Sequence, residues 1–173
     1  GAQYTIVSTQ FIPPATTTPV ASTSTVPLTS PPQIKRTPGP GKGLPTKPKV
    51  GIELYPEEAK WYNISAPFLV KWELPPDISS VGTAVNREVN FVPPPVSEGL
   101  TEGKLANSLA DGIWYSHVRF RNSVGWGATT HRKISIDTMP PNPFALEVPS
   151  GIAGDNPRPK LVFDATDALS GIG

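Results

Sequence analysis

Few side chains in this sequence could carry out chemistry. The chain has no cysteine and two histidines, His117 and His131. The absence of thiols excludes disulfide scaffolds, thiolate zinc sites and cysteine nucleophiles. In the strands predicted below, the two imidazoles face one surface, but a pair without a third ligand is more typical of polar surface residues than of zinc. A G-x-S-x-G elbow is also missing, and no close carboxylate pair lies in an evident cleft context. We therefore expect a protein that is not an enzyme and holds no cofactor.

An acidic segment near the end of the chain could bind a cation. Asp164, Asp167 and Ser170 supply oxygen ligands of the kind that hold Ca²⁺. The alternative is that both aspartates accept hydrogen bonds from backbone amides in the turn after a strand. The spacing of these residues leaves the two possibilities open.

Three aromatic residues could bind a sugar. Trp61, Tyr62 and Trp126 lie at predicted strand ends or loops, where flat rings can stack on sugar rings. Trp126, however, stands in a turn between Gly125 and Gly127, and such an aromatic can instead fold back to cover the end of a core. The sequence leaves both interpretations of Trp126 open, sugar binding and covering the end of the core.

The elements that must position these side chains begin only after an unusual segment. Residues 13–48 contain ten Pro, eight Thr and three Ser, and few large apolar side chains. Such a segment cannot offset its ordering entropy by burial, which predicts an extended linker over residues 11–49. Before it, AQYTIV alternates in polarity and predicts the last strand of a missing upstream domain over residues 1–10.

Charge and hydropathy exclude further classes of protein. No acidic residue precedes Glu53, yet the five Lys and Arg side chains of that region lack interleaved aromatics, so nucleic acid is not an expected partner. The apolar runs are a few residues long, against the roughly 20 that span a bilayer, so no transmembrane segment is expected in this sequence.

The sequence contains an internal repeat. Residues 65–81 match residues 156–172 at a constant offset of 91, which aligns Val70 with Leu161 and Trp72 with Phe163. A period of this length suits one β-sandwich of about 100 residues. We therefore predict a complete sandwich over residues 50–141 and the start of a second, truncated copy over residues 142–173.

Local patterns favour strands throughout. Segments 68–74, 114–121 and 133–137 alternate in polarity with a period of two, and turn-forming residues separate them. The pattern predicts that Tyr115, His117, Arg119 and Arg121 face outward. The predicted core consists of Phe68, Val70, Trp72, Trp114, Val118, Phe120, Ile134 and Ile136.

The run DGIWYSHVRFRNSVGWG followed by HRKISIDTMPP resembles the closing strands of bacterial immunoglobulin-like and fibronectin type III-like surface domains. The resemblance covers residues 50–173 and implies an all-β, immunoglobulin-like sandwich. It places Trp114 where that family usually has a Tyr whose hydroxyl bonds back to the chain, although Trp offers only an N–H donor. A strand ending in QYTIV before a Thr/Pro linker is also similar to cohesin-domain-containing surface proteins of uncultured bacteria.

Together these features lead us to expect a non-catalytic structural or adhesion module of a multi-domain bacterial protein. It would be extracellular or at the cell surface, with anchoring supplied by other regions. Its partners would be neighbouring domains of the same chain, and a protein or polysaccharide at the cell surface. The alternative is a carbohydrate-binding or enzyme-appended accessory module that uses Trp61, Tyr62 and Trp126.

Overall fold

The fold is all-β in the part of the chain that the structure describes. A computed structural model describes residues 27–143, 146–147, 162–163 and 165–171. These residues form strands, turns and extended segments, and no helix occurs among them. The described residues accordingly include no helix that could cross a membrane. The all-β prediction is confirmed at this level.

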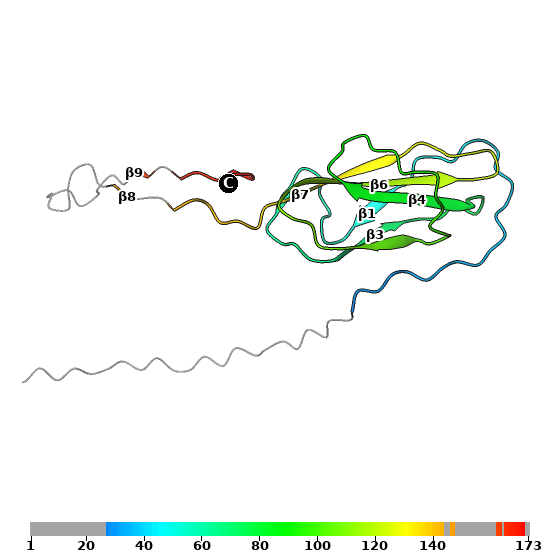
Figure 1. Cartoon of the computed structure of the whole chain (residues 1–173), viewed down its shortest axis with the longest axis horizontal. Coiled ribbons are helices and arrows are strands. Elements are labelled where there is room, and N and C mark those ends of the chain that lie inside the picture. The colour runs from blue at the N-terminus through cyan, green and yellow to red at the C-terminus, as the bar shows by residue number, and fades with distance from the viewer. Residues whose placement is uncertain (1–26, 144–145, 148–161, 164, 172–173) are drawn as a thin grey trace, which may run out of the picture.

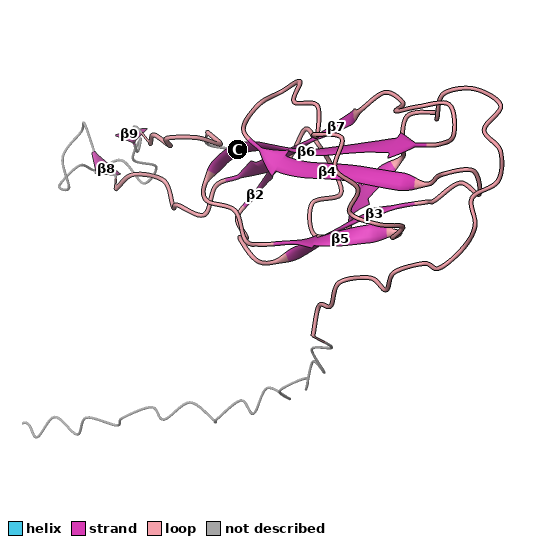
Figure 2. Ribbon diagram, turned by 45° about the vertical axis from the view of Figure 1, so that its right-hand side comes forward, coloured by secondary structure: helices cyan, strands magenta, loops and turns pink. Residues whose placement is uncertain are grey.

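Two sheets pack face to face (Figures 1 and 2). The first has the order β1-β3-β5 and is antiparallel; its strands are β1 (Val50–Ile52), β3 (Phe68–Trp72) and β5 (Gly103–Ala106). The second has the order β2-β7-β6-β4; its strands are β2 (Trp61–Tyr62), β4 (Ser80–Asn86), β6 (Gly112–Arg121) and β7 (Thr130–Ile136). β2 runs parallel to β7, while β7, β6 and β4 are antiparallel. We call this two-sheet unit the sandwich.

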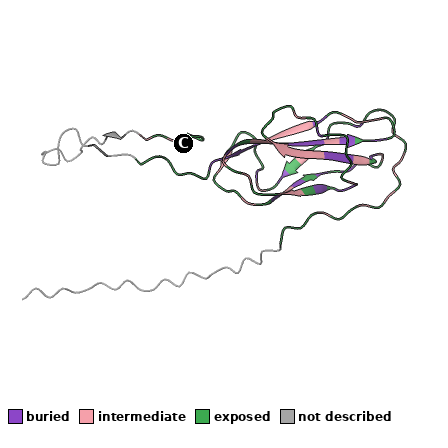
Figure 3. Cartoon of the chain, viewed as in Figure 1, coloured by how far each residue is buried: buried purple, intermediate pink, exposed green. Residues whose placement is uncertain are grey.

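The core lies between the two sheets, and strand alternation explains its composition. In β3, Phe68, Val70 and Trp72 are buried while Lys71 is exposed, because successive side chains point to opposite faces. The buried residues, drawn in purple in Figure 3, concentrate in the strands. Seven of the eight predicted core residues are buried; Trp114 packs against the core but is only partly buried. The core also contains Ile52, Tyr55, Leu74, Ile78, Val81 and Leu100, which the pattern had not identified.

The second half of the predicted linker differs from expectation. Residues 31–48, which we call the strap, are extended but lie against the sandwich, running along its outside and around one end (Figure 1). The Ile34 N–H donates to the Leu100 carbonyl at 2.7 Å, and the Gly39 N–H donates to the Pro76 carbonyl at 3.1 Å. Pro45 is buried. The expectation rested on the scarcity of large apolar side chains, whereas the strap packs through proline rings, backbone groups and the side chain of Ile34. Residues 1–26 lie outside the described residues.

A third, two-stranded sheet follows the sandwich. β8 (Leu146–Glu147) pairs with β9 (Val162–Phe163) in the antiparallel sense, with Leu146 opposite Phe163. Most of residues 142–173 lie outside the described residues. The second copy of the sandwich therefore stays a prediction.

Trp72 should contribute most to stability among the core side chains near β5. It is 5% exposed, and its indole N–H donates to the Thr101 carbonyl at 2.6 Å. We expect Trp72→Ala to lower the free energy of unfolding by about 3–5 kcal/mol, because it leaves a cavity and an unpaired buried carbonyl. Urea denaturation measures this loss. Val124→Ala, at an exposed side chain, should change stability by less than about 0.5 kcal/mol and serves as the control.

Candidate functional site

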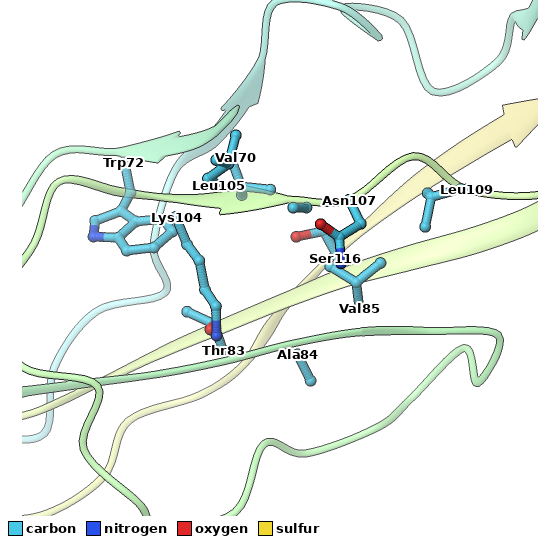
Figure 4. Close-up of a pocket in the computed structure, with 11 residues that line it drawn as sticks. Val70, Trp72, Thr83, Ala84, Val85, Lys104, Leu105, Asn107, Leu109 and Ser116 are labelled. Carbon is cyan, nitrogen blue, oxygen red and sulfur yellow. The ribbon is translucent and has the colours of Figure 1, made fainter. Parts of the chain in front are cut away.

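A groove lies between the two sheets, on the side where both end in an edge strand. β5 ends the first sheet and β4 ends the second. Between them lies a cavity of about 330 Å³. In Figure 4, Val70, Trp72 and Leu105 lie on one side of it, and Thr83, Val85 and Ser116 on the other. The lining mixes apolar side chains with the polar Thr83, Lys104, Asn107 and Ser116, and its apolar part can receive an apolar side chain.

Glu98 joins the two edge strands at the groove. One carboxylate oxygen accepts a hydrogen bond from the Thr83 hydroxyl of β4 at 2.7 Å, and the other pairs with the Lys104 ammonium of β5. Its backbone N–H donates to the Val81 carbonyl at 3.1 Å, while its carbonyl accepts from the Gln33 side chain of the strap at 3.2 Å. This one residue therefore connects both sheets and the strap. Sequence reasoning missed it because its partners are distant along the chain.

A second cavity lies where the sandwich meets the following segment. Its volume is about 420 Å³, and its lining consists of Lys60, Trp61, Tyr62, Asn63, Asp137 and Ser170. Two of the predicted sugar-stacking residues, Trp61 and Tyr62, are thus brought together. The Tyr62 hydroxyl exchanges hydrogen bonds with the backbone of Glu57, and its ring meets the Tyr55 ring edge-on at 5.2 Å. Tyr62 is therefore held by the protein, which leaves Trp61 as the aromatic better placed to meet a ligand.

Trp126 does not line this cavity. The Arg119 guanidinium lies 4.4 Å from the centre of its ring. A Cβ atom added at Gly82 would lie 3.3 Å from the same ring, so Trp126 packs closely on β4. This favours a covering role, although Trp126 covers the outer face of the second sheet instead of the end of the core.

The acidic segment is organised by backbone amides. One oxygen of Asp167 accepts the N–H groups of Leu169, Ser170 and Gly171 at 3.0, 3.0 and 3.2 Å. These bonds lower the pKa of Asp167. The Ser170 N–H also donates to Asp137, at 2.9 Å. Among the described residues no three His, Cys, Asp or Glu side chains gather as metal ligands. Asp164 lies outside these residues, so the predicted calcium site is not tested as a whole.

The two histidines meet as predicted, but His117 is not a surface residue. Its exposed fraction is 0%, and its Nδ1 lies 2.8 Å from Nδ1 of His131. Its Nε2 lies 3.0 Å from the Asn86 side-chain oxygen, and the Phe91 ring packs at 5.6 Å. The side chain points outward from β6, as the alternation predicted, but the segment after β4 covers it.

This arrangement favours neutral imidazoles. With Nε2–H of His117 donating to Asn86, its Nδ1 accepts the Nδ1–H of His131. Burial, with a smaller effect from His131, lowers the pKa of His117 to about 4. Burial and the nearby Lys47 charge also lower the pKa of His131.

Comparisons with known proteins identify no relative, since no protein-family model, no curated protein and no solved structure matches the chain.

The histidine pair predicts a loss of stability in acid. The pKa of His117 lies at about 4 in the folded chain and near 6.5 in the unfolded chain. Below pH 6.5 the unfolded chain therefore binds a proton that the folded chain does not, so the free energy of unfolding falls as the pH drops toward 4. The difference amounts to about 3 kcal/mol. Urea denaturation between pH 7 and 4.5 should show a smaller decline in His117→Gln than in the wild type. Lys133→Gln, on the same face, should keep the wild-type decline. Equal declines in all three proteins would contradict the assignment.

Proposed function

We propose that the chain is a non-catalytic structural and adhesion module of a multi-domain bacterial cell-surface or secreted protein, in which immunoglobulin-like sandwiches follow one another in tandem. The first support is the strand pairing after the sandwich. β8 pairs with β9 in the same antiparallel sense as β1 with β3. The intervening stretches, residues 53–67 and 148–161, are 15 and 14 residues long by the strand bounds.

The observation that carries the proposal is the hydrogen bonding around the junction, residues 138–141. Asp137, directly after β7, accepts the Ser170 N–H at 2.9 Å. The Asn142 N–H donates to the Thr166 carbonyl at 2.8 Å, and its side-chain amide donates to the Thr166 hydroxyl at 3.1 Å. Bonds on both sides of residues 138–141 restrict bending at the junction. A restricted junction suits a module that holds its neighbours at a set position.

The resemblance to bacterial immunoglobulin-like and fibronectin type III-like domains gains support from β6. The Trp114 indole N–H donates to the Ala110 carbonyl, four residues upstream, at 2.7 Å. This is the kind of backbone bond that the family makes with a Tyr hydroxyl. Gly112, in the D-G turn before Trp114, has a φ of 120°, a conformation that favours glycine.

The alternative function is a carbohydrate-binding or enzyme-appended accessory module. The 420 Å³ cavity at the junction favours it, because Trp61 supplies an aromatic ring there and Lys60 and Asn63 supply hydrogen-bond donors. In this alternative the partner would be an extracellular polysaccharide, and Trp126 would take no part because Arg119 stacks on its ring.

Restriction at the junction is testable in solution. Asp137→Ala removes the acceptor for the Ser170 N–H, so we expect residues 165–171 to move more independently of β6 than in the wild type. Backbone ¹⁵N relaxation measures this as shorter local correlation times in the variant. Glu53→Ala, at an exposed carboxylate, is the control and should match the wild type. Independent motion of this segment already in the wild type would overturn the proposal of a restricted junction.

Binding to immobilised polysaccharides separates the two functions. If the chain is a structural module, surface plasmon resonance should detect no saturable binding to cellulose fragments, xylan or peptidoglycan. Trp61→Ala should then leave the signal unchanged. Saturable binding that Trp61→Ala weakens about tenfold or more, while Trp126→Ala does not, would favour the accessory module, since an aromatic–sugar contact is comparable to a strong interface anchor.

A further inference from the structure

The edge of β5 that faces away from β3 has free backbone groups. β5 pairs with β3 so that Lys104 lies opposite Val70, and the Trp72 N–H donates to the Glu102 carbonyl at 3.1 Å. In an antiparallel pair, bonded residues alternate with residues whose N–H and C=O groups point away. Leu105 therefore directs its backbone groups to the other side, where β5 has no partner strand among the described residues.

The beginning of the strap already lies at this edge and runs antiparallel to it. The Ile34 N–H donates to the Leu100 carbonyl at 2.7 Å. Pro31 precedes Ile34 by three residues and lies beside Gly103, which follows Leu100 by three residues. A Cβ atom added at Gly103 would be 3.2 Å from the proline ring. The chain upstream of Pro31 is thus delivered at the start of β5, beside the groove.

Taking Pro31 and Gly103 as facing residues assigns a position to each upstream residue. Thr29 falls opposite Leu105, so its N–H and C=O can bond to the outward groups of β5. Pro27 and Pro31 lack an N–H donor, which is tolerated in an edge strand. Leu28 falls opposite Ala106, which lies across from the buried Phe68 and therefore on the inner face of the sheet.

The position of Leu28 matches the groove in chemistry. In the structure the Leu28 side chain is 52% exposed. The adjoining groove of about 330 Å³ has an apolar part that includes Val85 and Leu109, beside polar side chains such as Asn107. Burial of the leucine side chain, together with new backbone hydrogen bonds to β5, would oppose the entropy cost of ordering four residues.

We propose that Pro27–Ser30 closes onto β5 as a further strand of the first sheet and inserts Leu28 into the groove. The occupant is the chain's own segment, because Pro31 already lies beside Gly103, the Ile34–Leu100 bond gives the antiparallel direction, and no intervening chain is needed. The groove is then an acceptor site for an extended strand, and its closure would cover an otherwise unpaired edge. This inference is independent of the function proposed above.

A disulfide tests the register, because the natural chain has no cysteine. Residues 28 and 106 would form a non-hydrogen-bonded antiparallel pair with Cα atoms about 4.5 Å apart, within disulfide range. We expect Leu28→Cys combined with Ala106→Cys to form an intramolecular disulfide under mild oxidation, detected by intact mass and loss of free thiols. Leu28→Cys combined with Lys133→Cys, on the other sheet, is the control and should stay reduced.

The other outcomes overturn the proposal. A disulfide-linked dimer would mean that the segment of a second copy occupies the groove. No disulfide, or equal oxidation of both pairs, would mean that the segment does not dock there.

Hydrogen exchange tests the same closure without cysteine. Closure leaves the Leu105 N–H bonded to Thr29, so it should be protected, and Leu28→Asp should speed its exchange about tenfold. Leu44→Asp, at an exposed leucine within the strap, should leave the exchange of the Leu105 N–H unchanged. Because Leu28 is exposed in the open form, the variant is expected to fold. Equal exchange of the Leu105 N–H in the wild type and in Leu28→Asp would overturn the proposal.

Discussion

Trp72 is the side chain on which the two sheets, the entry to β5 and the groove all depend. Its ring is 5% exposed and forms part of the groove wall, and its indole N–H satisfies the buried Thr101 carbonyl at 2.6 Å. A buried carbonyl without a partner would cost free energy, so this bond and the packing of the ring reinforce each other. Trp72 thereby ties the chain that enters β5 to the end of β3, beside the groove.

Short sheets leave edges, and this protein covers its edges with segments that are not strands. The strap donates from Ile34 to Leu100, and Glu98 connects β4, β5 and the strap through polar bonds. Prolines are tolerated in such an edge segment because each removes only its own N–H donor, while Ile34 and Gly39 supply donors to the sandwich. Among the described residues, no strand pairs with the outer edge of β5 over Lys104–Ala106.

The second sheet is covered on its outer face as well. Phe91 and the buried Pro93 belong to the segment that follows β4, and Phe91 packs on His117. Trp126 packs on the same face at Gly82. A titratable ring that strand alternation directs outward is therefore removed from water. The acid sensitivity expected of the protein arises from this covering and from the opposing Nδ1 atoms of the His117–His131 pair.

Strand alternation was sufficient to predict β3, β6 and β7 and most of the core, because the side-chain period of a strand is local and one face of each sheet is buried. The meeting of the two histidines also followed from adjacent strands. The groove did not, since its lining comes from strands far apart in sequence. Nor did the burial of His117 or the docking of the strap. Composition shows which side chains are apolar, but only tertiary packing decides which backbone edges and outward faces another segment will cover.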